Sequence, residues 1–153
     1  MSDFVQRIYD FNKDNGLLED GYSDYLESSF QVEEALEGFN LEALASQLYS
    51  SERPEDICNA KYLSRHIITM AKGQKMSLAD VDRLDKACDA IVFAVGSIAK
   101  LGLTPTQIHE ALNIVMDANL AKSGCPKDAE GKLLKPDTFP NPEPRLQMLL
   151  DLR

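Results

Sequence analysis

The sequence has few of the features that mark several large classes of protein. It contains no apolar run near the roughly 18 residues that a membrane-spanning helix needs. Its first residues lack the basic and apolar regions of a signal peptide. Its three cysteines are an odd number at no metal-ligand spacing, so neither a disulfide framework nor a zinc site is indicated. We therefore expect a reduced, cytoplasmic protein that does not bind a membrane.

Basic residues are also in short supply. The chain has 16 Lys and Arg against 25 Asp and Glu, which gives a formal net charge of −9. This balance argues against a nucleic-acid partner, because such binding needs basic patches that displace counterions. An acidic protein can still bind a polyphosphate when divalent cations stand between its carboxylates and the phosphates. The placement of the acids therefore matters more than their sum.

Glycine and proline are scarce before the C-terminal region, and apolar residues recur with helical rather than alternating periodicity. A chain of 153 residues fits a single domain over residues 1–153. We predict an all-α fold, a multi-helix bundle that ends in an irregular, proline-containing tail over residues 123–153. The predicted helices cover residues 3–15, 24–39, 41–49, 54–72, 77–100, 105–122 and 145–152.

Two helix starts carry capping signals. Thr104 is followed by Pro105 at the first helical position and by Gln107 three residues on, which is typical of a capping box. Ser77 with Asp80 is a weaker version of the same signal. The predicted helix that Ser77 opens contains Ala90–Val95, which is apolar on every side. Such a stretch is buried by several neighbours or by a partner subunit, so we expect a homodimer or homotetramer.

The acids gather on two predicted helices. On the first, Glu33, Glu34 and Glu37 are three and four residues apart and converge on one edge, with no basic residue nearby along the chain. On the second, Asp85 and Asp89 share one stripe, together with Asp82.

Asp89 directly precedes the apolar segment Ala90–Val95, so we expect it to need a partner at the edge of a buried region. Two acidic faces opposed in a bundle make an all-oxygen site for Mg²⁺ or Mn²⁺. The competing interpretation is two solvated faces whose acids merely align.

The pattern Glu33-Glu34-x-x-Glu37 resembles the EExxE signature of the all-α nucleoside triphosphate pyrophosphohydrolases, the MazG-like superfamily, which also holds dimeric dUTPases and phosphoribosyl-ATP pyrophosphohydrolases. The run from Asp89 to Gly96 resembles the second motif of that family. Further matches follow in chain order: Asn119-Leu-Ala-Lys122, Gly131-Lys-Leu-Leu-Lys-Pro136 and Phe139-Pro-x-Pro142. The sequence departs from the family in having Lys86 where the second motif usually has glutamate. Asp85, on the same helix face, is the favoured replacement, with Asp82 as the alternative.

The resemblance implies hydrolysis of a (deoxy)nucleoside triphosphate to the monophosphate and pyrophosphate. It implies metal ligation by Glu33, Glu34, Glu37, Asp85 and Asp89, with Mg²⁺ or Mn²⁺ as the cofactor. Either Glu33 or Glu34 would take the proton from the attacking water. Substrate contacts are expected from Asn119, Lys122, Lys132 and Arg145.

Two alternatives remain open at this point: a non-catalytic helical interaction module, and a phosphoribosyl-ATP pyrophosphohydrolase. The base preference and the number of metal ions are not specified. Phe4, Tyr9 and Phe11 have a spacing that favours core packing over base stacking.

Overall fold

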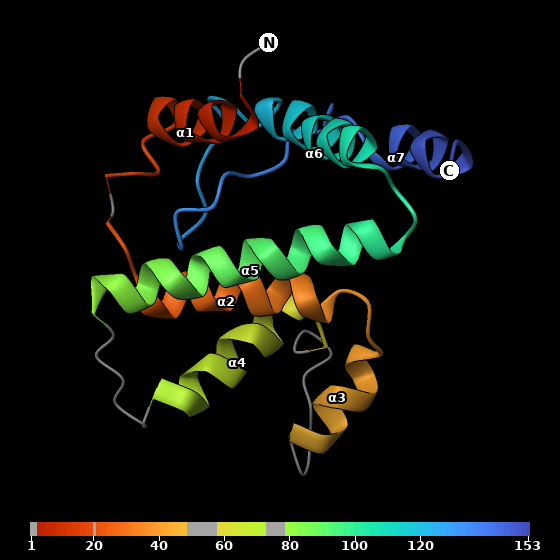
Figure 1. The fold of residues 1–153 in the computed structure, drawn as a ribbon. Helices are drawn as coiled ribbons and strands as arrows, with labels where there is room; N and C mark the ends of the chain where they lie inside the picture. The colour runs from red at the N-terminus through yellow and green to blue at the C-terminus, as the bar shows by residue number, and fades with distance from the viewer. Residues whose placement is uncertain (1–2, 20, 49–57, 73–78) are drawn as a thin grey trace. The chain divides into compact units, whose positions relative to one another are not determined.

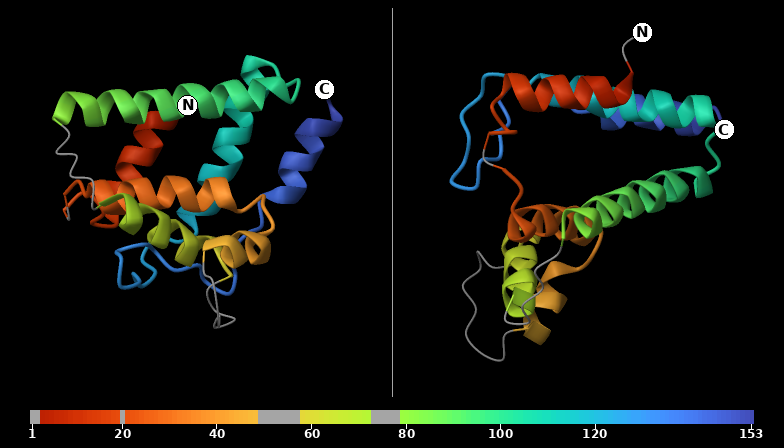
Figure 2. Two further views of the ribbon diagram at one scale, coloured as in Figure 1. Left: turned by 90° about the horizontal axis from the view of Figure 1, so that it is seen from below. Right: turned by 60° about the vertical axis from the view of Figure 1, so that its left-hand side comes forward.

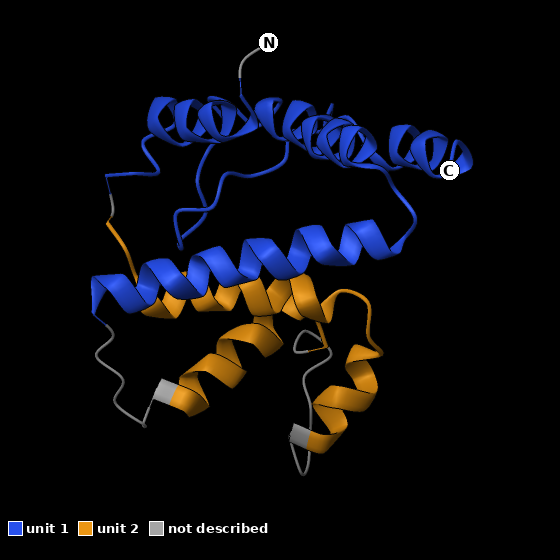
Figure 3. Cartoon of the chain, in the orientation of Figure 1, with its two compact units in different colours: residues 1–20, 78–153 blue, residues 21–77 orange. Residues whose placement is uncertain are grey.

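The computed structural model describes residues 3–19, 21–48, 58–72 and 79–153. These residues contain seven α-helices and no strand, so the predicted all-α class is confirmed. The chain divides into two compact units, residues 1–20 with 78–153 and residues 21–77, which are coloured separately in Figure 3.

The first unit holds four helices, α1 (Phe4–Asp14), α5 (Asp80–Lys100), α6 (Pro105–Leu120) and α7 (Glu143–Asp151). Helix α6 is the centre of this unit, because α1, α5 and α7 all contact it (Figure 1). Its core is a cluster of buried side chains from the start of α6 and from α7. The cluster consists of Leu103, Ile108, Ala111, Ile114 and Leu149, with Ile98, Leu112, Leu146 and Leu150 packed around it.

The predicted capping box at the start of α6 is confirmed. The Thr104 hydroxyl accepts a hydrogen bond from the Gln107 backbone N–H at 3.4 Å, and the Gln107 side chain accepts one from the Thr104 N–H at 2.9 Å. Before it, α5 ends at Lys100, and Gly102, two residues further on, has a φ of +88°, a conformation that glycine adopts at little cost. The chain then turns by 115° from α5 into α6 (Figure 2).

The second unit holds α2 (Asp24–Leu36), α3 (Leu41–Leu48) and α4 (Ala60–Lys72), and α2 packs against α4. Ser29 on α2 and Ser64 on α4 are completely buried. Each hydroxyl donates to a carbonyl of its own helix, Ser29 to Tyr25 at 2.6 Å and Ser64 to Lys61 at 2.8 Å. Small side chains satisfied in this way are buried without leaving an unpaired polar group.

Several predicted boundaries differ from the structure. Helix α2 ends at Leu36 rather than at residue 39, because Gly38 follows within two residues. The described part of α4 begins at Ala60, where Asn59 caps the backbone N–H of Tyr62 at 2.8 Å. The predicted starts at Pro54 and Ser77 lie outside the described residues.

Candidate functional site

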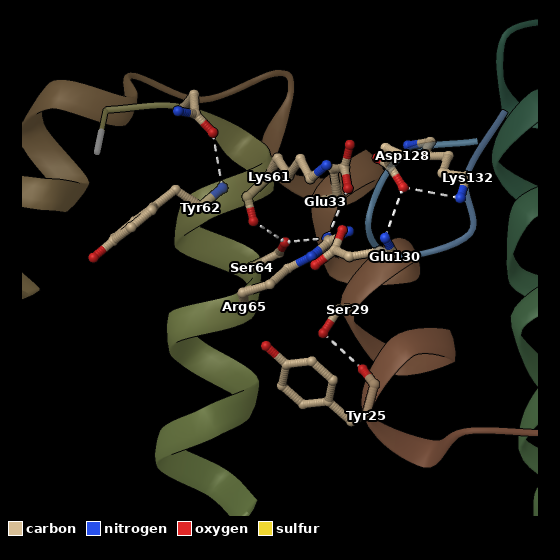
Figure 4. A network of polar contacts seen from close by, with 11 residues as sticks. Tyr25, Ser29, Glu33, Lys61, Tyr62, Ser64, Arg65, Asp128, Glu130 and Lys132 are labelled. Carbon is tan, nitrogen blue, oxygen red and sulfur yellow. Dashed lines mark hydrogen bonds and ion pairs between the residues drawn. The ribbon is translucent and has the colours of Figure 1, made fainter. Parts of the chain in front are cut away.

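The acidic edge of α2 is divided in the structure between one buried and two exposed carboxylates. Glu33 is 8% exposed and turns toward α4, where its Oε2 accepts from Nη1 of Arg65 at 2.7 Å (Figure 4). Glu34 and Glu37 are exposed. Glu37 is the C-cap residue just past the end of α2, and Glu33 is committed to an ion pair within the unit.

Arg65 is the residue that sequence reasoning missed. Its guanidinium donates to Glu33 and to the Ser64 hydroxyl at 2.8 Å, and it lies 5.1 Å from the centre of the Phe30 ring. The cation–π geometry holds the guanidinium against α2 while the ion pair neutralises the buried glutamate. The local sequence carries no signal for it, because at 3.6 residues per turn Arg65 lies on the opposite side of the helix from Leu63 and Ile67.

The aspartates of α5 are all exposed, which corrects the expectation for one of them. Asp89 does not lie at the edge of a buried segment, because Asp89 itself and the following Ile91, Val92 and Phe93 are exposed. Asp82 accepts a hydrogen bond from the Ala79 N–H at 3.2 Å at the start of the helix. An aspartate engaged at a helix start is a weaker candidate ligand, so Asp85 and Asp89 are the better pair on this face.

These acids have the ligand atoms that a divalent cation needs, but the described residues do not bring three of them together. Carboxylate oxygens are the ligands that Mg²⁺ and Mn²⁺ prefer. Over residues 3–19, 21–48, 58–72 and 79–153, no three His, Cys, Asp or Glu side chains form a group ready to hold a metal ion. Of Glu33, Glu34 and Glu37, the last two are exposed donors, and Arg65 competes with any cation for Glu33.

The end of α6 and the tail bring two of the predicted substrate residues together. Lys122 Nζ donates to Asn119 Oδ1 at 2.6 Å and lies 5.3 Å from the centre of the Phe139 ring. Lys135 Nζ lies 5.1 Å from the same centre. Two ammonium groups around one aromatic ring form a local positive cluster, which we call the Lys122–Lys135 cluster, on a chain whose net charge is −9.

The tail is fixed to the end of α1, which holds this cluster in place. Lys127 Nζ donates to the Gly16 carbonyl at 2.9 Å, and the Gly124 N–H donates to Asn15 Oδ1 at 3.0 Å. Asp128 then closes a turn by accepting from the backbone N–H of Lys132 at 3.0 Å. Lys127 and Leu133 form an isolated antiparallel bridge, the nearest approach to a strand in the described chain.

Arg145, the last predicted substrate residue, is engaged elsewhere. Its Nη1 contacts Asp117 Oδ2 at 3.2 Å, and Asp117 also pairs with Arg7, which donates to Asn113 as well. The hydrogen bond from Arg7, with that from Arg145, lowers the pKa of Asp117 below its ordinary value of 3.8. This network ties α1 and α7 to α6, and Arg145 takes part in it.

The cysteines and the aromatic residues of α1 show no contact in the described residues that indicates a catalytic or binding role. All three cysteines, which lie in the described residues, are free thiols, and Cys88 is exposed. Tyr9 on α1 is 53% exposed, whereas Phe4 and Phe11 are half-buried, which fits packing for the two phenylalanines.

Comparison with protein-family models, with curated proteins and with solved structures finds no match for this chain. In the described residues, no single helix is long and apolar enough to cross a membrane. One bent pair, α5 with α6, passes that test of length and composition only when its two helices are counted together.

Proposed function

We propose that the chain is a Mg²⁺-dependent hydrolase that cleaves a (deoxy)nucleoside triphosphate to the monophosphate and pyrophosphate, in the manner of the MazG-like enzymes that its sequence resembles. The observation that carries the proposal is the edge of α2. Three glutamates at helical spacing lie there, two of them exposed, and the third is fixed by a buried arginine of α4. The exposed carboxylates supply the oxygen ligands that Mg²⁺ prefers.

In this proposal the metal ligands are taken from those that the resemblance implies, Glu34, Glu37, Asp85 and Asp89. Bound Mg²⁺ supplies a positive charge that offsets the phosphates and acidifies a water molecule. Glu33 acts as a further ligand only when one of its carboxylate oxygens is released by Arg65. The main role of Glu33 in this proposal is therefore to orient this edge of the helix.

Glu34 is the better candidate for the general base. Of the two carboxylates proposed from sequence, Glu33 is held by Arg65, whereas Glu34 is exposed and on the same turn of α2. A general base must be within hydrogen-bond reach of the water that it deprotonates. A carboxylate that is already bound to a guanidinium is less able to accept that proton.

The Lys122–Lys135 cluster is the proposed contact for the substrate phosphates. Lys122 is oriented by Asn119 and by the Phe139 ring, so it approaches an anion with less loss of side-chain freedom than a solvated lysine. Lys132 lies in the same tail and is a further proposed contact. The proposed enzyme is a homo-oligomer of the reducing cytoplasm, with an all-α bundle of the MazG type.

A panel of nucleoside and deoxynucleoside triphosphates with Mg²⁺, with release of pyrophosphate as the readout, tests the proposal. Replacement of Glu34→Gln is expected to lower the rate by about 10²–10⁴-fold, the usual contribution of a general base. The matched control is Glu42→Gln, which removes a charge from an exposed glutamate of the same unit and should leave the rate unchanged. Equal rates for the two variants would contradict the assignment of Glu34.

Two other functions give different results in the same panel. A phosphoribosyl-ATP pyrophosphohydrolase would release pyrophosphate from that compound and not from the ordinary nucleotides. A non-catalytic interaction module would release none from any of them, and would take up no Mg²⁺ or Mn²⁺ in calorimetry with a triphosphate present. Either outcome would replace the function proposed here.

A further inference from the structure

Two lysine ammonium groups share one aromatic ring in the first unit. Nζ of Lys122 lies 5.3 Å and Nζ of Lys135 lies 5.1 Å from the centre of the Phe139 ring. Because each is close to the same centre, the two charges are within about 10 Å of each other, which is no more than the Debye length at 0.1 M ionic strength. They therefore repel each other and also act together on a nearby anion.

A turn and a buried side chain fix the segment that carries Lys135 and Phe139. Leu133 is buried, which anchors the chain just before Lys135. The N–H of Phe139 donates to the Pro136 carbonyl at 2.9 Å, and this turn brings the ring back toward Lys135. The lysine and the ring are thus held near each other by local backbone contacts. A ligand that binds them loses less conformational entropy than one that orders a free segment.

An ordinary structural role accounts for one of the two lysines and not for the other. Lys122 follows the end of α6 by two residues, where a cation interacts favourably with the helix dipole, and it donates to Asn119. Lys135 is exposed, 13 residues further along the chain, and forms no ion pair with a carboxylate within the described residues. Its contact with Phe139 places it near a charge of its own sign, an arrangement that a bound anion would stabilise.

We propose that Phe139 is a positioning residue, and that it holds the Lys122–Lys135 cluster as a metal-independent site for the pyrophosphate end of the substrate. The negative face of the ring attracts the ammonium groups and repels an anion, so Phe139 acts through the lysines. This inference rests on the hydrolase function proposed above. It adds Lys135 and Phe139 to the residues that determine affinity, and it makes pyrophosphate a ligand that the chain binds without Mg²⁺.

The chemistry of the two cations favours a phosphoryl group over a carboxylate. Each lysine ammonium group is a compact point charge with three donors, without the planar fork by which an arginine matches two carboxylate oxygens. A phosphoryl group carries about two negative charges near pH 7 on three acceptor oxygens, so it can accept from both ammonium groups at once. A carboxylate carries a single charge and would neutralise only one of the pair.

The first test is calorimetric titration of the full chain with pyrophosphate in the presence of EDTA, so that no divalent cation bridges the two. The wild type should bind pyrophosphate more tightly than sulfate, because pyrophosphate has more charge and more acceptor oxygens. Lys135→Met should weaken this binding by about tenfold or more, the usual effect of losing a hydrogen bond between charged groups. The matched control is Lys100→Met, which removes an exposed cation at the end of α5 in the same unit and should leave the affinity unchanged.

The second test separates positioning by the ring from simple packing. Phe139→Leu keeps an apolar side chain without a ring and should weaken pyrophosphate binding by about two- to fivefold, the range of one exposed cation–π contact. Phe139→Tyr keeps the ring and should restore the affinity that Phe139→Leu loses. A packing role alone would lower the urea midpoint of Phe139→Leu and leave its affinity for pyrophosphate as in the wild type.

The outcomes separate this site from the hydrolase function. A wild-type chain that does not bind pyrophosphate in EDTA at millimolar concentration would overturn the site, even if the chain hydrolyses triphosphates with Mg²⁺. So would equal affinities for the wild type, Lys135→Met and Phe139→Leu, an equal loss in Lys100→Met, or equal binding of sulfate. Binding that depends on Lys135 and Phe139, in a chain that releases pyrophosphate from no triphosphate, would support the site and refute the hydrolase function.

Discussion

The ion pair between Glu33 and Arg65 leads to a quantitative prediction about stability. Both side chains are about nine-tenths buried, at 10% and 11% exposure, so the surrounding water screens the pair weakly. Replacement of Arg65→Met keeps most of the side-chain volume and leaves the glutamate buried without its guanidinium. The expected loss is about 3–5 kcal/mol in the free energy of unfolding, typical of breaking a buried pair on one side.

A double variant separates this effect from simple loss of packing. In Glu33→Met with Arg65→Met, neither charge remains, and two apolar side chains meet across α2 and α4. Because such replacements are often neutral or stabilising, the double variant should regain most of the stability that the single variant loses. This recovery should appear as a negative coupling free energy that a pure packing defect would not produce.

Urea unfolding followed by circular dichroism at one fixed protein concentration is the assay, because association would otherwise shift the apparent stability. A loss below about 1 kcal/mol for Arg65→Met, the range of solvent-exposed pairs, would refute the reasoning. So would a double variant no more stable than Arg65→Met alone. Either result would mean that Arg65 contributes little to holding Glu33, which would then remain available as an ordinary metal ligand.

Three further predictions concern the first unit. Asp117→Asn should cost about 0.5–1 kcal/mol at neutral pH, a figure reduced for the 44% exposure of this side chain. Because pairing with Arg7 lowers the pKa of Asp117 in the folded state, its contribution is complete above the ordinary value of 3.8. It disappears as the pH falls through the lower folded value, so wild type and variant should converge in acid unfolding curves. Thr104→Ala should lose about 1 kcal/mol in urea unfolding, since it removes the cap of α6. Lys122→Met should raise KM for the triphosphate, while Arg145→Met should change stability more than KM; the reverse pattern would return Arg145 to the substrate site.

The local sequence was sufficient to predict the helices because their signals lie within a few residues of one another. The capping box at Thr104 and Gln107 and the stop at Gly102 are determined by backbone groups at short separation. Predicted helix boundaries were wrong where the local signal was weak, as at the end of α2. Apolar periodicity predicted that the stretch after Asp89 is buried, whereas Ile91, Val92 and Phe93 are exposed in the structure.

In the candidate site, too, features that depend on neighbouring residues were predictable, and contacts between distant residues were not. Spacing along one helix predicted that Glu33, Glu34 and Glu37 share an edge, because 3.6 residues per turn fixes that geometry wherever the helix forms. Spacing could not predict that one of the three turns to a guanidinium 32 residues further along the chain. Nor could it predict that Phe139 gathers Lys122 and Lys135 around its ring, since these contacts depend on how the tail folds back.

The sequence by itself determined which side chains are neighbours on each helix and how much negative charge the chain carries. Only the tertiary structure decided which of those charges are neutralised, because burial and ion pairing depend on the face that each helix turns toward another. Glu33 and Glu34 are adjacent in the chain and identical in chemistry, yet the packing of α2 on α4 encloses the first and leaves the second exposed.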